Sequence, residues 1–359
     1  MTVLNKPDIR APGEIDAGWL TAVLQAGGID AVVNGFTAKA VGTGQIGDSV
    51  RFSLSYARKG PDAPDSLVGK FPAAAPESRG TGVMLGNYIR EVRFYQDLAP
   101  RALIRTPRVY FTDVDEATSD FVLMMEDLAP AEQGDQLTGV TLEQARLVVV
   151  EAAKLHASHW QDPALDEMPW VSGSKAAGQR EGHDEQVVML WQAFKDRYGP
   201  RLTPDWIKAG DWLSVNAATV AEGAGAPRCL THNDFRPDNM MFGNDCGGYP
   251  LTVLDWQSYA YGVGATDLAY FLAGALSPEA RRAAEPELLG LYHDTLTGLG
   301  VSGYGMDDLK RDYGRGAYLL FLTAFFAAMI VTQTERGDRM FLQMLGSAAD
   351  HMWDHGLIG

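Results

Sequence analysis

One stretch past the middle of the chain constrains its fold most strongly. The apolar Leu230 and then Thr231 lead into residues 232–239 (His-Asn-Asp-Phe-Arg-Pro-Asp-Asn), and a short apolar segment follows at 240–242. The spacing is H-x-D-x-x-x-x-N, so a turn stiffened by one proline holds a carboxylate and an amide on a single loop between two short strands. A second isolated carboxylate, Asp255, ends the next apolar run. The chain therefore carries two carboxylates and one amide at the ends of short buried strands.

Phosphoryl transfer from ATP needs such a set of groups. One carboxylate receives the proton of the acceptor hydroxyl, while an amide oxygen and a second carboxylate hold Mg²⁺ against the phosphates. In this interpretation Asp234 is the base, and Asn239 and Asp255 are the metal ligands. The alternative is a plain polar turn between two buried strands, which a His-Asn-Asp-Pro cluster can also make.

A glycine-rich segment lies between two strand-like runs near the N-terminus. Gly42, Gly44 and Gly47 form a G-x-G-x-x-G pattern. A dinucleotide-binding loop of this pattern opens a helix, whereas residues 49–56 alternate as a strand does. Strand, glycine loop and strand instead predict a hairpin that covers phosphates, because glycine lets the backbone N–H groups come close. Ordinary hairpins carry glycines too, so the pattern alone is weak.

A lysine and a glutamate follow in the order that phosphate binding requires. Lys70 lies in a short apolar strand expected over 66–72, and Glu91 lies in an amphipathic helix expected over 88–98. We expect Lys70 to reach the α- and β-phosphates and Glu91 to hold it there as an ion pair. The alternatives are a solvated lysine at a strand end and a glutamate paired with a neighbouring surface arginine.

Two lobes are expected from the length and from the order of elements. Further strands at 109–111 and 121–125 complete a five-stranded antiparallel sheet, and the chain is mainly helical from Thr141 onward. The predicted fold class is α+β, with an N-terminal lobe over 1–127 and a larger helical C-terminal lobe over 128–359. A length of 359 residues also exceeds what one core usually serves.

Composition narrows the range of partners. The net charge of −16 argues against nucleic acid or an anionic membrane as a partner, and it favours a cationic or neutral small molecule as acceptor. The most apolar run, 317–331, is shorter than the roughly 18 residues of a membrane span and is expected to be a buried helix. Cys229 and Cys246 are too few for a disulfide framework, and residues 1–14 lack a signal-peptide core, so the cytoplasm is the expected location.

Two further features have alternative explanations. His156 and His159 are three residues apart on a predicted helix and could resemble a metal pair, but packing or hydrogen bonding is favoured because no third ligand has suitable spacing. Asp267 begins another helix, where it could cap that helix or brace the loop that carries Asp234; the alternative is a plain N-terminal carboxylate that the helix dipole favours.

The order of these motifs resembles the aminoglycoside phosphotransferase and choline kinase superfamily over roughly residues 32–272. The segments 91–95 (Glu-Val-Arg-Phe-Tyr), 125–128 (Met-Glu-Asp-Leu) and 232–234 (His-Asn-Asp) look closest to ecdysteroid kinase-like phosphotransferases and their bacterial relatives. The resemblance implies a two-lobed protein-kinase-like fold with ATP in the cleft. It also implies a Mg²⁺-dependent transfer of phosphate to a hydroxyl group of a small molecule.

The resemblance also assigns roles to single residues. It makes Asp234 the catalytic aspartate, Asn239 and Asp255 the Mg²⁺ ligands, and Lys70 with Glu91 the pair that anchors the phosphates. Met125 and Asp127 lie where members bind adenine through main-chain atoms. Arg236 takes the place of a lysine that lies near the γ-phosphate in protein kinases.

The chain departs from protein kinases in two respects. Trp256-Gln257 replaces the Phe-Gly that follows the metal aspartate, so their in/out switch is not expected. Eleven residues lie between Asp255 and Asp267, too few for an activation loop that docks peptides. The competing functions are a catalytically silent, nucleotide-binding pseudokinase or regulatory module and a structural protein that retains the fold. The usual sign of a pseudokinase is a missing lysine, base or metal ligand, and this chain has all of them.

Overall fold

A computed structural model describes residues 6–42, 46–172, 183–222 and 225–358. The chain forms two compact units. The first comprises Met1–Arg101, Thr106–Pro130 and Leu254–Gln257, and the second comprises Ala102–Arg105, Ala131–Val253 and Ser258–Gly359. The predicted lobes are 1–127 and 128–359; the units differ from them in that residues 102–105 belong to the second unit and residues 128–130 and 254–257 to the first. The segment that carries Asp255 belongs to the first unit, although it comes after residues 232–239 in the chain.

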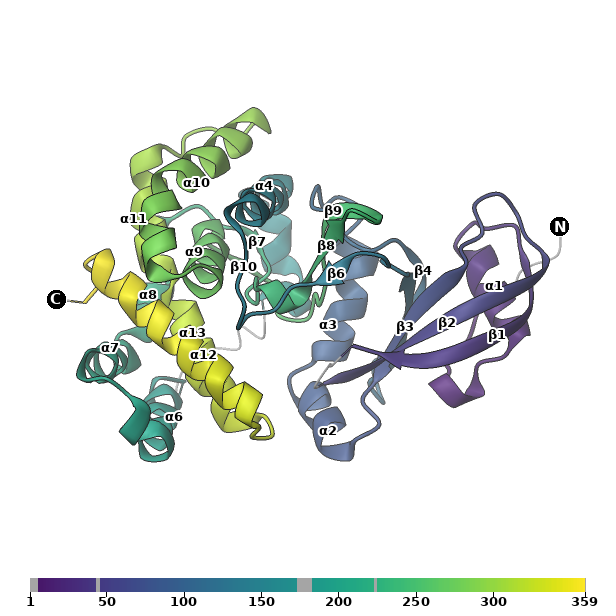
Figure 1. Cartoon of the computed structure of the whole chain (residues 1–359), viewed down its shortest axis with the longest axis horizontal. Helices are drawn as coiled ribbons and strands as arrows, with labels where there is room; N and C mark the ends of the chain where they lie inside the picture. The colour runs from purple at the N-terminus through teal and green to yellow at the C-terminus, as the bar shows by residue number, and fades with distance from the viewer. Residues whose placement is uncertain (1–5, 43–45, 173–182, 223–224, 359) are drawn as a thin grey trace. The chain divides into compact units, whose positions relative to one another are not determined.

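The first unit is built on one antiparallel sheet, which confirms the predicted five strands. The strand order is β1-β2-β3-β5-β4, and every neighbouring pair is antiparallel (Figure 1). The strands are β1 (Val32–Val41), β2 (Gly47–Arg58), β3 (Ser66–Pro72), β4 (Val109–Asp115) and β5 (Asp120–Glu126). The helical elements are η1 (Pro12–Glu14), α1 (Ala17–Ala26), α2 (Pro76–Met84), α3 (Asn87–Arg93) and the π-helical turn η2 (Phe94–Leu98).

The two faces of this sheet carry different groups because successive strand residues point to opposite sides. On β3, Leu67 and Phe71 are buried in one apolar cluster with the inward-facing residues of α1. Lys70 lies one residue out of phase with them and therefore projects from the opposite face. Helix α3 covers that face, where Tyr88 stacks on Phe121 of β5 with ring centroids 4.9 Å apart.

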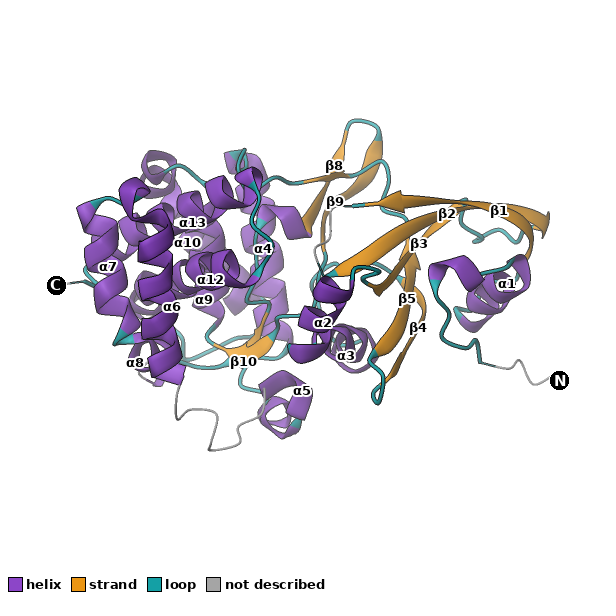
Figure 2. Cartoon of the chain, turned by 90° about the horizontal axis from the view of Figure 1, so that it is seen from below, coloured by secondary structure: helices purple, strands orange, loops and turns teal. Residues whose placement is uncertain are grey.

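The second unit is mainly helical, as predicted (Figure 2). Its α-helices are α4 (Leu142–Ser158), α5 (Pro169–Ser172), α6 (His183–Tyr198), α7 (Pro204–Ser214), α8 (Ala217–Ala221), α9 (Gly264–Ala275), α10 (Pro278–Gly298), α11 (Met306–Gly316), α12 (Tyr318–Ile330) and α13 (Glu335–Asp354). Its short strands are β6 (Glu132–Gln133), β7 (Cys229–Thr231), β8 (Met240–Asn244), β9 (Gly247–Val253) and β10 (Ala260–Gly262), and its 3₁₀ turns are η3 (Pro163–Glu167), η4 (Gly199–Arg201) and η6 (Pro237–Asn239).

Helix α9 is the central element of the second unit, since all of its residues are buried. It begins at Gly264, where a Cβ atom would lie 2.8 Å from the His156 ring and 3.0 Å from the sulfur of Cys229. Such distances are closer than side chains tolerate, so the lack of a side chain lets α9 start directly against α4 and β7. The position of α9 is important because its first turns face residues 232–234.

The predicted buried helix over the apolar run is α12, whose Phe321, Ala324 and Phe325 are buried. By length and composition alone, the helical stretch Met306–Ile330 would be sufficient to cross a membrane, but half of its most apolar window is buried inside the protein. Core helices pass the same test, so the stretch is weak evidence for a membrane span. The absence of a membrane partner stays a prediction.

Helices α10, α11 and α13 meet around a buried arginine. Arg281 of α10 is 1% exposed, and its guanidinium group donates hydrogen bonds to Glu285 and Asp354. Tyr313 of α11 donates its hydroxyl to the same Glu285 oxygen at 2.7 Å. Two carboxylates and a phenol thus surround one buried cation, and the three helices are joined by these contacts.

Two histidines complete this cluster, His351 in α13 and His355 directly after its end. The ligand atoms of Glu285, His351 and His355 lie within 4.8 Å of one another, a geometry that a metal ion could also use. However, Nη1 of Arg281 bonds Glu285 and lies 3.4 Å from Nδ1 of His351, so a guanidinium group already supplies the positive charge there. We therefore interpret the cluster as an ion-pair network that fastens α13, and not as a metal site.

This network makes stability depend on pH. Burial, His355 and Arg281 lower the pKa of His351 to about 3. The imidazole of the unfolded chain has a pKa of about 6.5. Between about pH 6.5 and pH 3 the unfolded state therefore binds a proton at this imidazole, and the folded state does not. The stabilising effect of the neutral imidazole is complete above about pH 6.5 and is lost as the pH falls toward 3.

We predict that His351→Gln makes the free energy of unfolding less sensitive to acid between about pH 6.5 and pH 4. Urea unfolding at a series of pH values measures this effect. The control is His293→Gln, on the partly buried surface of α10, which should keep the wild-type dependence on pH. An unchanged slope in His351→Gln would contradict the prediction.

Candidate functional site

Lys70 is the centre of the polar group in the first unit. Its Nζ lies 2.8 Å from Oε1 of Glu91 and 2.7 Å from Oδ1 of Asp255, so the predicted Lys70–Glu91 ion pair is present. Burial by itself would lower the pKa of Lys70, but the charges of Asp255 and Glu91 raise it above its usual value. The side chain is therefore a permanent ammonium group, as a phosphate ligand must be. One cation holds two carboxylates in place.

The segment that carries Asp255 is fixed to the helix that carries Glu91. The indole of Trp256 is fully buried and stacks on Phe94 at 4.0 Å with an interplanar angle of 2°. Arg90 donates from Nε to the main-chain oxygen of Gln257 at 2.8 Å, and Gln257 donates from Nε2 to Oδ2 of Asp255 at 2.9 Å. Asp255 itself has φ = 64°, a conformation that aspartate tolerates better than most residues. These contacts hold Trp256 and Gln257 in place, and the absence of a Phe-Gly-type switch stays a prediction.

The glycine pattern lies between two strands, β1 and β2, as expected for a phosphate-covering hairpin. Gly42 has φ = 76°, in the region that favours glycine. A Cβ on Gly47 would lie 3.2 Å from the carbonyl oxygen of Phe71 and 3.3 Å from Cε of Lys70, so this glycine allows β2 to run close beside the lysine. Gly44 lies outside the described residues. The phosphate-binding role of the three glycines stays a prediction.

Met125 and Asp127 lie at the end of β5. The carboxylate of Asp127 is already occupied, because Arg51 donates to it from Nη2 at 2.9 Å with Nε 2.6 Å from its other oxygen, and Ser66 donates to it at 2.6 Å. Burial would raise the pKa of Asp127, but the hydrogen bonds from Arg51 and Ser66 lower it. The side chain therefore locks β2 and β3 to the end of β5. The binding of adenine by main-chain atoms of Met125 and Asp127 stays a prediction.

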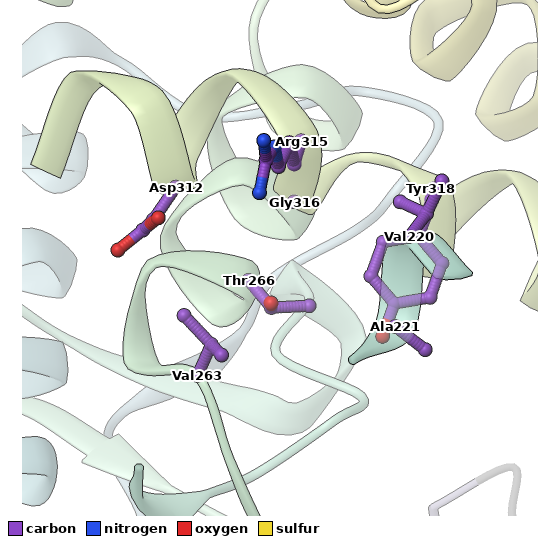
Figure 3. Close-up of a pocket in the computed structure, with 8 residues that line it drawn as sticks. All are labelled: Val220, Ala221, Val263, Thr266, Asp312, Arg315, Gly316 and Tyr318. Carbon is purple, nitrogen blue, oxygen red and sulfur yellow. The ribbon is translucent and has the colours of Figure 1, made fainter. Parts of the chain in front are cut away.

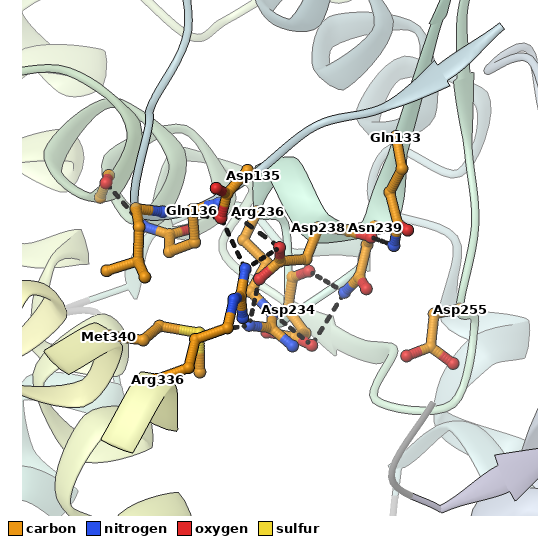
Figure 4. Close-up of polar contacts among 12 residues, drawn as sticks. Gln133, Asp135, Gln136, Asp234, Arg236, Asp238, Asn239, Asp255, Arg336 and Met340 are labelled. Atoms are coloured by element: carbon orange, nitrogen blue, oxygen red, sulfur yellow. Dashed lines mark hydrogen bonds and ion pairs between the residues drawn. The ribbon is translucent and has the colours of Figure 1, made fainter. Parts of the chain in front are cut away.

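In the second unit, residues 232–239 bring the predicted base and one predicted metal ligand together (Figure 4). Asn239 donates from Nδ2 to Oδ2 of Asp234 and to its main-chain oxygen, both at 2.8 Å. Both bonds use the amide nitrogen, so Oδ1 is the atom of Asn239 that suits a hard cation such as Mg²⁺. Tyr270 of α9 donates its hydroxyl to Oδ1 of Asp234 at 2.9 Å.

Arg236 is part of an ion-pair chain. Its Nε lies 3.1 Å from Oδ1 of Asp234, and its Nη1 lies 2.9 Å from Oδ2 of Asp238. Arg336 of α13 continues the chain, at 3.4 Å from Asp238 and 2.6 Å from Asp135 (Figure 4). Positive and negative groups alternate along it. The predicted place of Arg236 near the γ-phosphate stays a prediction, since here its guanidinium group bridges two aspartates.

Asp267 braces the loop, which decides between the two roles that the sequence left open. Its fully buried carboxylate accepts the main-chain N–H of His232 at 2.6 Å and that of Asn233 at 2.8 Å. Asn233 has φ = 63°, which turns these successive N–H groups toward one acceptor. His156 lies 3.2 Å from the same carboxylate and 2.7 Å from the hydroxyl of Tyr292, so it is a hydrogen-bonding residue, as expected.

Tyr270 and Arg336 also belong to this site, and neither was predicted from the sequence. For Tyr270 a signal existed, because it follows Asp267 by three residues on one helix and therefore lies on the same face. For Arg336 there was none, since it approaches Asp135 across 201 residues of chain.

Two small hollows in the second unit do not contain the predicted catalytic residues. One has a volume of about 10 Å³, room for about one water molecule, and lies among α8, α9, α11 and α12 beside Thr266, Asp312 and Tyr318 (Figure 3). The other has about 230 Å³ and is lined by Trp160, Tyr304 and neighbouring polar residues. Both fall below the several hundred Å³ typical of small-molecule sites, so neither is assigned to the acceptor.

The model of a known protein family matches most of this chain. The model of the Phosphotransferase enzyme family matches residues 55–301, a span that contains the predicted lysine, base and metal ligands but not the glycine pattern. Among curated proteins, none matches this chain.

Three solved structures share the fold. A Ralstonia eutropha protein proposed to be an aminoglycoside phosphotransferase has 13% identity and a TM-score of 0.56, with 95% of this chain and 98% of that one covered. Choline kinase from Cryptosporidium parvum has 10% identity and a TM-score of 0.53, with 90% and 91% covered. The GDP complex of a variant of aminoglycoside 2'-phosphotransferase-IIIa has 12% identity and a TM-score of 0.51, with 91% and 95% covered. At these identities the likeness concerns the fold, which is the predicted protein-kinase-like one. The closer likeness to ecdysteroid kinase-like members stays a prediction.

Proposed function

The chain belongs to the phosphotransferase enzyme family and is a small-molecule kinase, and on that premise we propose that it transfers the γ-phosphoryl group of ATP to a hydroxyl group with Mg²⁺ as cofactor. The observation that carries this proposal is the loop 232–239, where Asp234 and Asn239 bond each other and Asp267 holds the backbone. A proton acceptor and a hard metal ligand are thus kept at a constant separation. A plain polar turn does not need this brace.

Each polar group has a part in the proposed reaction. Asp234 would take the proton of the acceptor hydroxyl as the new O–P bond forms, and Lys70 would neutralise charge on the phosphates. The carboxylate of Asp255 and Oδ1 of Asn239 are hard oxygen donors, which fit Mg²⁺ and would hold it. When bound, the ion supplies charge neutralisation on the phosphates. The nucleotide of the related structure is GDP, so the choice of ATP over GTP is our proposal.

We further propose that the acceptor is cationic or neutral. Around Asp234 the ion-pair chain contains three carboxylates (Asp135, Asp234 and Asp238) and two guanidinium groups (Arg236 and Arg336), which sum to −1. The whole chain carries −16. An anionic acceptor would meet this excess of negative charge, whereas an amine would be attracted to it. The choline kinase with this fold acts on a cationic alcohol, as its name states, which supports the proposal.

The first prediction tests the base. Asp234→Asn should lower turnover by about 10² or more, because the amide cannot accept the proton, while the affinity for ATP stays close to that of the unchanged protein. ADP release with an acceptor found by screening hydroxylated compounds measures turnover, and ATP titration measures affinity. The control is Asp205→Asn, an exposed carboxylate on α7. Full turnover in Asp234→Asn would refute the assignment, and ATP binding without turnover in the unchanged protein would favour a pseudokinase.

The metal assignment makes a separate prediction. In the unchanged protein Mg²⁺ should tighten ATP binding, and Asp255→Ala should abolish that tightening because a principal oxygen ligand is lost. Isothermal titration with ATP, with Mg²⁺ and with EDTA, gives the four affinities required. Gln257→Ala serves as a comparison, since it removes a hydrogen bond to Asp255 but leaves the carboxylate, and it should keep most of the effect. Equal affinity with and without Mg²⁺ in the unchanged protein would contradict the assignment.

The charge of the acceptor can be tested independently of both variants. Among alcohols of similar size, we expect cationic and neutral ones to be phosphorylated in preference to anionic ones. The KM of a cationic acceptor should rise with salt, because exposed charges are screened beyond about 8 Å at physiological ionic strength. ADP release at low and high salt measures both effects. A clear preference for an anionic alcohol would overturn this proposal and leave the kinase assignment intact.

A further inference from the structure

We propose that Tyr270 is a positioning residue, whose hydroxyl fixes the orientation of the Asp234 carboxylate for proton transfer. The inference rests on the proposed function of Asp234 as base. Tyr270 is fully buried on α9, and its hydroxyl oxygen lies 2.9 Å from Oδ1 of Asp234. A buried phenol needs a partner for its O–H group, and here that partner is the one carboxylate to which catalysis is assigned.

The direction of this hydrogen bond follows from chemistry. A carboxylate accepts, so the phenol of Tyr270 donates. Burial, together with the charge of Asp234, raises the pKa of Tyr270 well above its usual value, which keeps the proton on the phenol oxygen. The proton of the Tyr270 hydroxyl is therefore directed to Oδ1 of Asp234.

Tyr270 belongs to a different element of the fold from the other donors to the Asp234 carboxylate. Asn239 and Arg236 belong to the same loop as Asp234 and move with it. Among the donors to Asp234 that the described part of the chain supplies, Tyr270 is the one that lies outside residues 232–239. It binds Oδ1 while Asn239 binds Oδ2, so the two oxygens are anchored from different elements. Rotation of the carboxylate would break one of these bonds.

Helix α9 therefore holds the loop 232–239 through two contacts, one to its backbone and one to a side chain. Asp267 binds the backbone N–H groups of His232 and Asn233, and Tyr270, one turn further along the same face, binds the side chain of Asp234. A rigid, fully buried helix is a suitable support, because a displacement of about 1 Å at a reacting group can cost about 10² in rate. The hydroxyl of Tyr270 should thus affect turnover more than it affects folding or nucleotide binding.

The test is Tyr270→Phe, which removes one oxygen and keeps the ring. We expect kcat to fall about tenfold or more, with the KM for ATP within about twofold of the unchanged protein. The matched control is Tyr313→Phe, another fully buried tyrosine of the second unit, whose hydroxyl donates to a carboxylate, Glu285, at 2.7 Å. It should lose similar stability, read as the thermal unfolding midpoint, and keep its kcat. If Tyr270→Phe folds poorly, kcat is compared at a lower temperature, at which circular dichroism shows both variants to be as fully folded as the unchanged protein.

A double variant separates positioning from a general structural effect. In an Asp234→Asn background there is no base to orient, so Tyr270→Phe should cause no further fall in kcat. An independent, multiplicative fall would show that Tyr270 does not act through Asp234 and would overturn the inference, as would a wild-type kcat in Tyr270→Phe. Failure of the proposed function has a different outcome, because Asp234→Asn would then itself keep its turnover.

Discussion

In the second unit, the conformation of the loop that carries Asp234 depends on one buried carboxylate. Asp267 accepts two successive main-chain N–H groups at a point where Asn233 adopts a left-handed conformation. Without that acceptor, two buried donors would be unsatisfied, each at a cost of about 1–3 kcal/mol. Because α9 is buried along its whole length, it has little freedom to shift, and the loop inherits that rigidity. The positions of Asp234, Asn239 and Arg236 all follow from this attachment.

In the first unit, one cation has the comparable role. Lys70 is the shared partner of Glu91 and Asp255, and the segment of Asp255 is stacked through Trp256 on Phe94. Removing the ammonium group would leave two poorly solvated carboxylates beside each other, which is strongly unfavourable. The same balance suits a polyanionic ligand with its cation, since phosphate can share the lysine while a metal ion shares the carboxylate. The group therefore joins β3, α3 and the segment of Asp255, and its role in binding phosphate stays a proposal.

Several features could be predicted from local sequence, because they depend on short-range periodicity and spacing. Alternation along 66–72 places Lys70 on the other face of the strand from Leu67 and Phe71. The helix that follows carries Glu91 at a position from which it can pair with Lys70. The five strands, the glycine hairpin and the helical second half follow from turn residues and apolar repeats in the same way. The spacing in H-x-D-x-x-x-x-N places a carboxylate and an amide on one loop whatever surrounds it.

Tertiary structure decided which groups these residues meet. Lys70 reaches Asp255 across 185 residues, Arg51 reaches Asp127 across 76, and Tyr270 reaches Asp234 across 36. Arg236 bridges two aspartates, Asp234 and Asp238, although its sequence position suggested a phosphate ligand. The sequence by itself determined the chemical groups and the elements that carry them, because both are encoded within a few turns of chain. The partners were decided only in the folded protein, because a contact between distant segments depends on how whole elements are packed, and no local pattern records that.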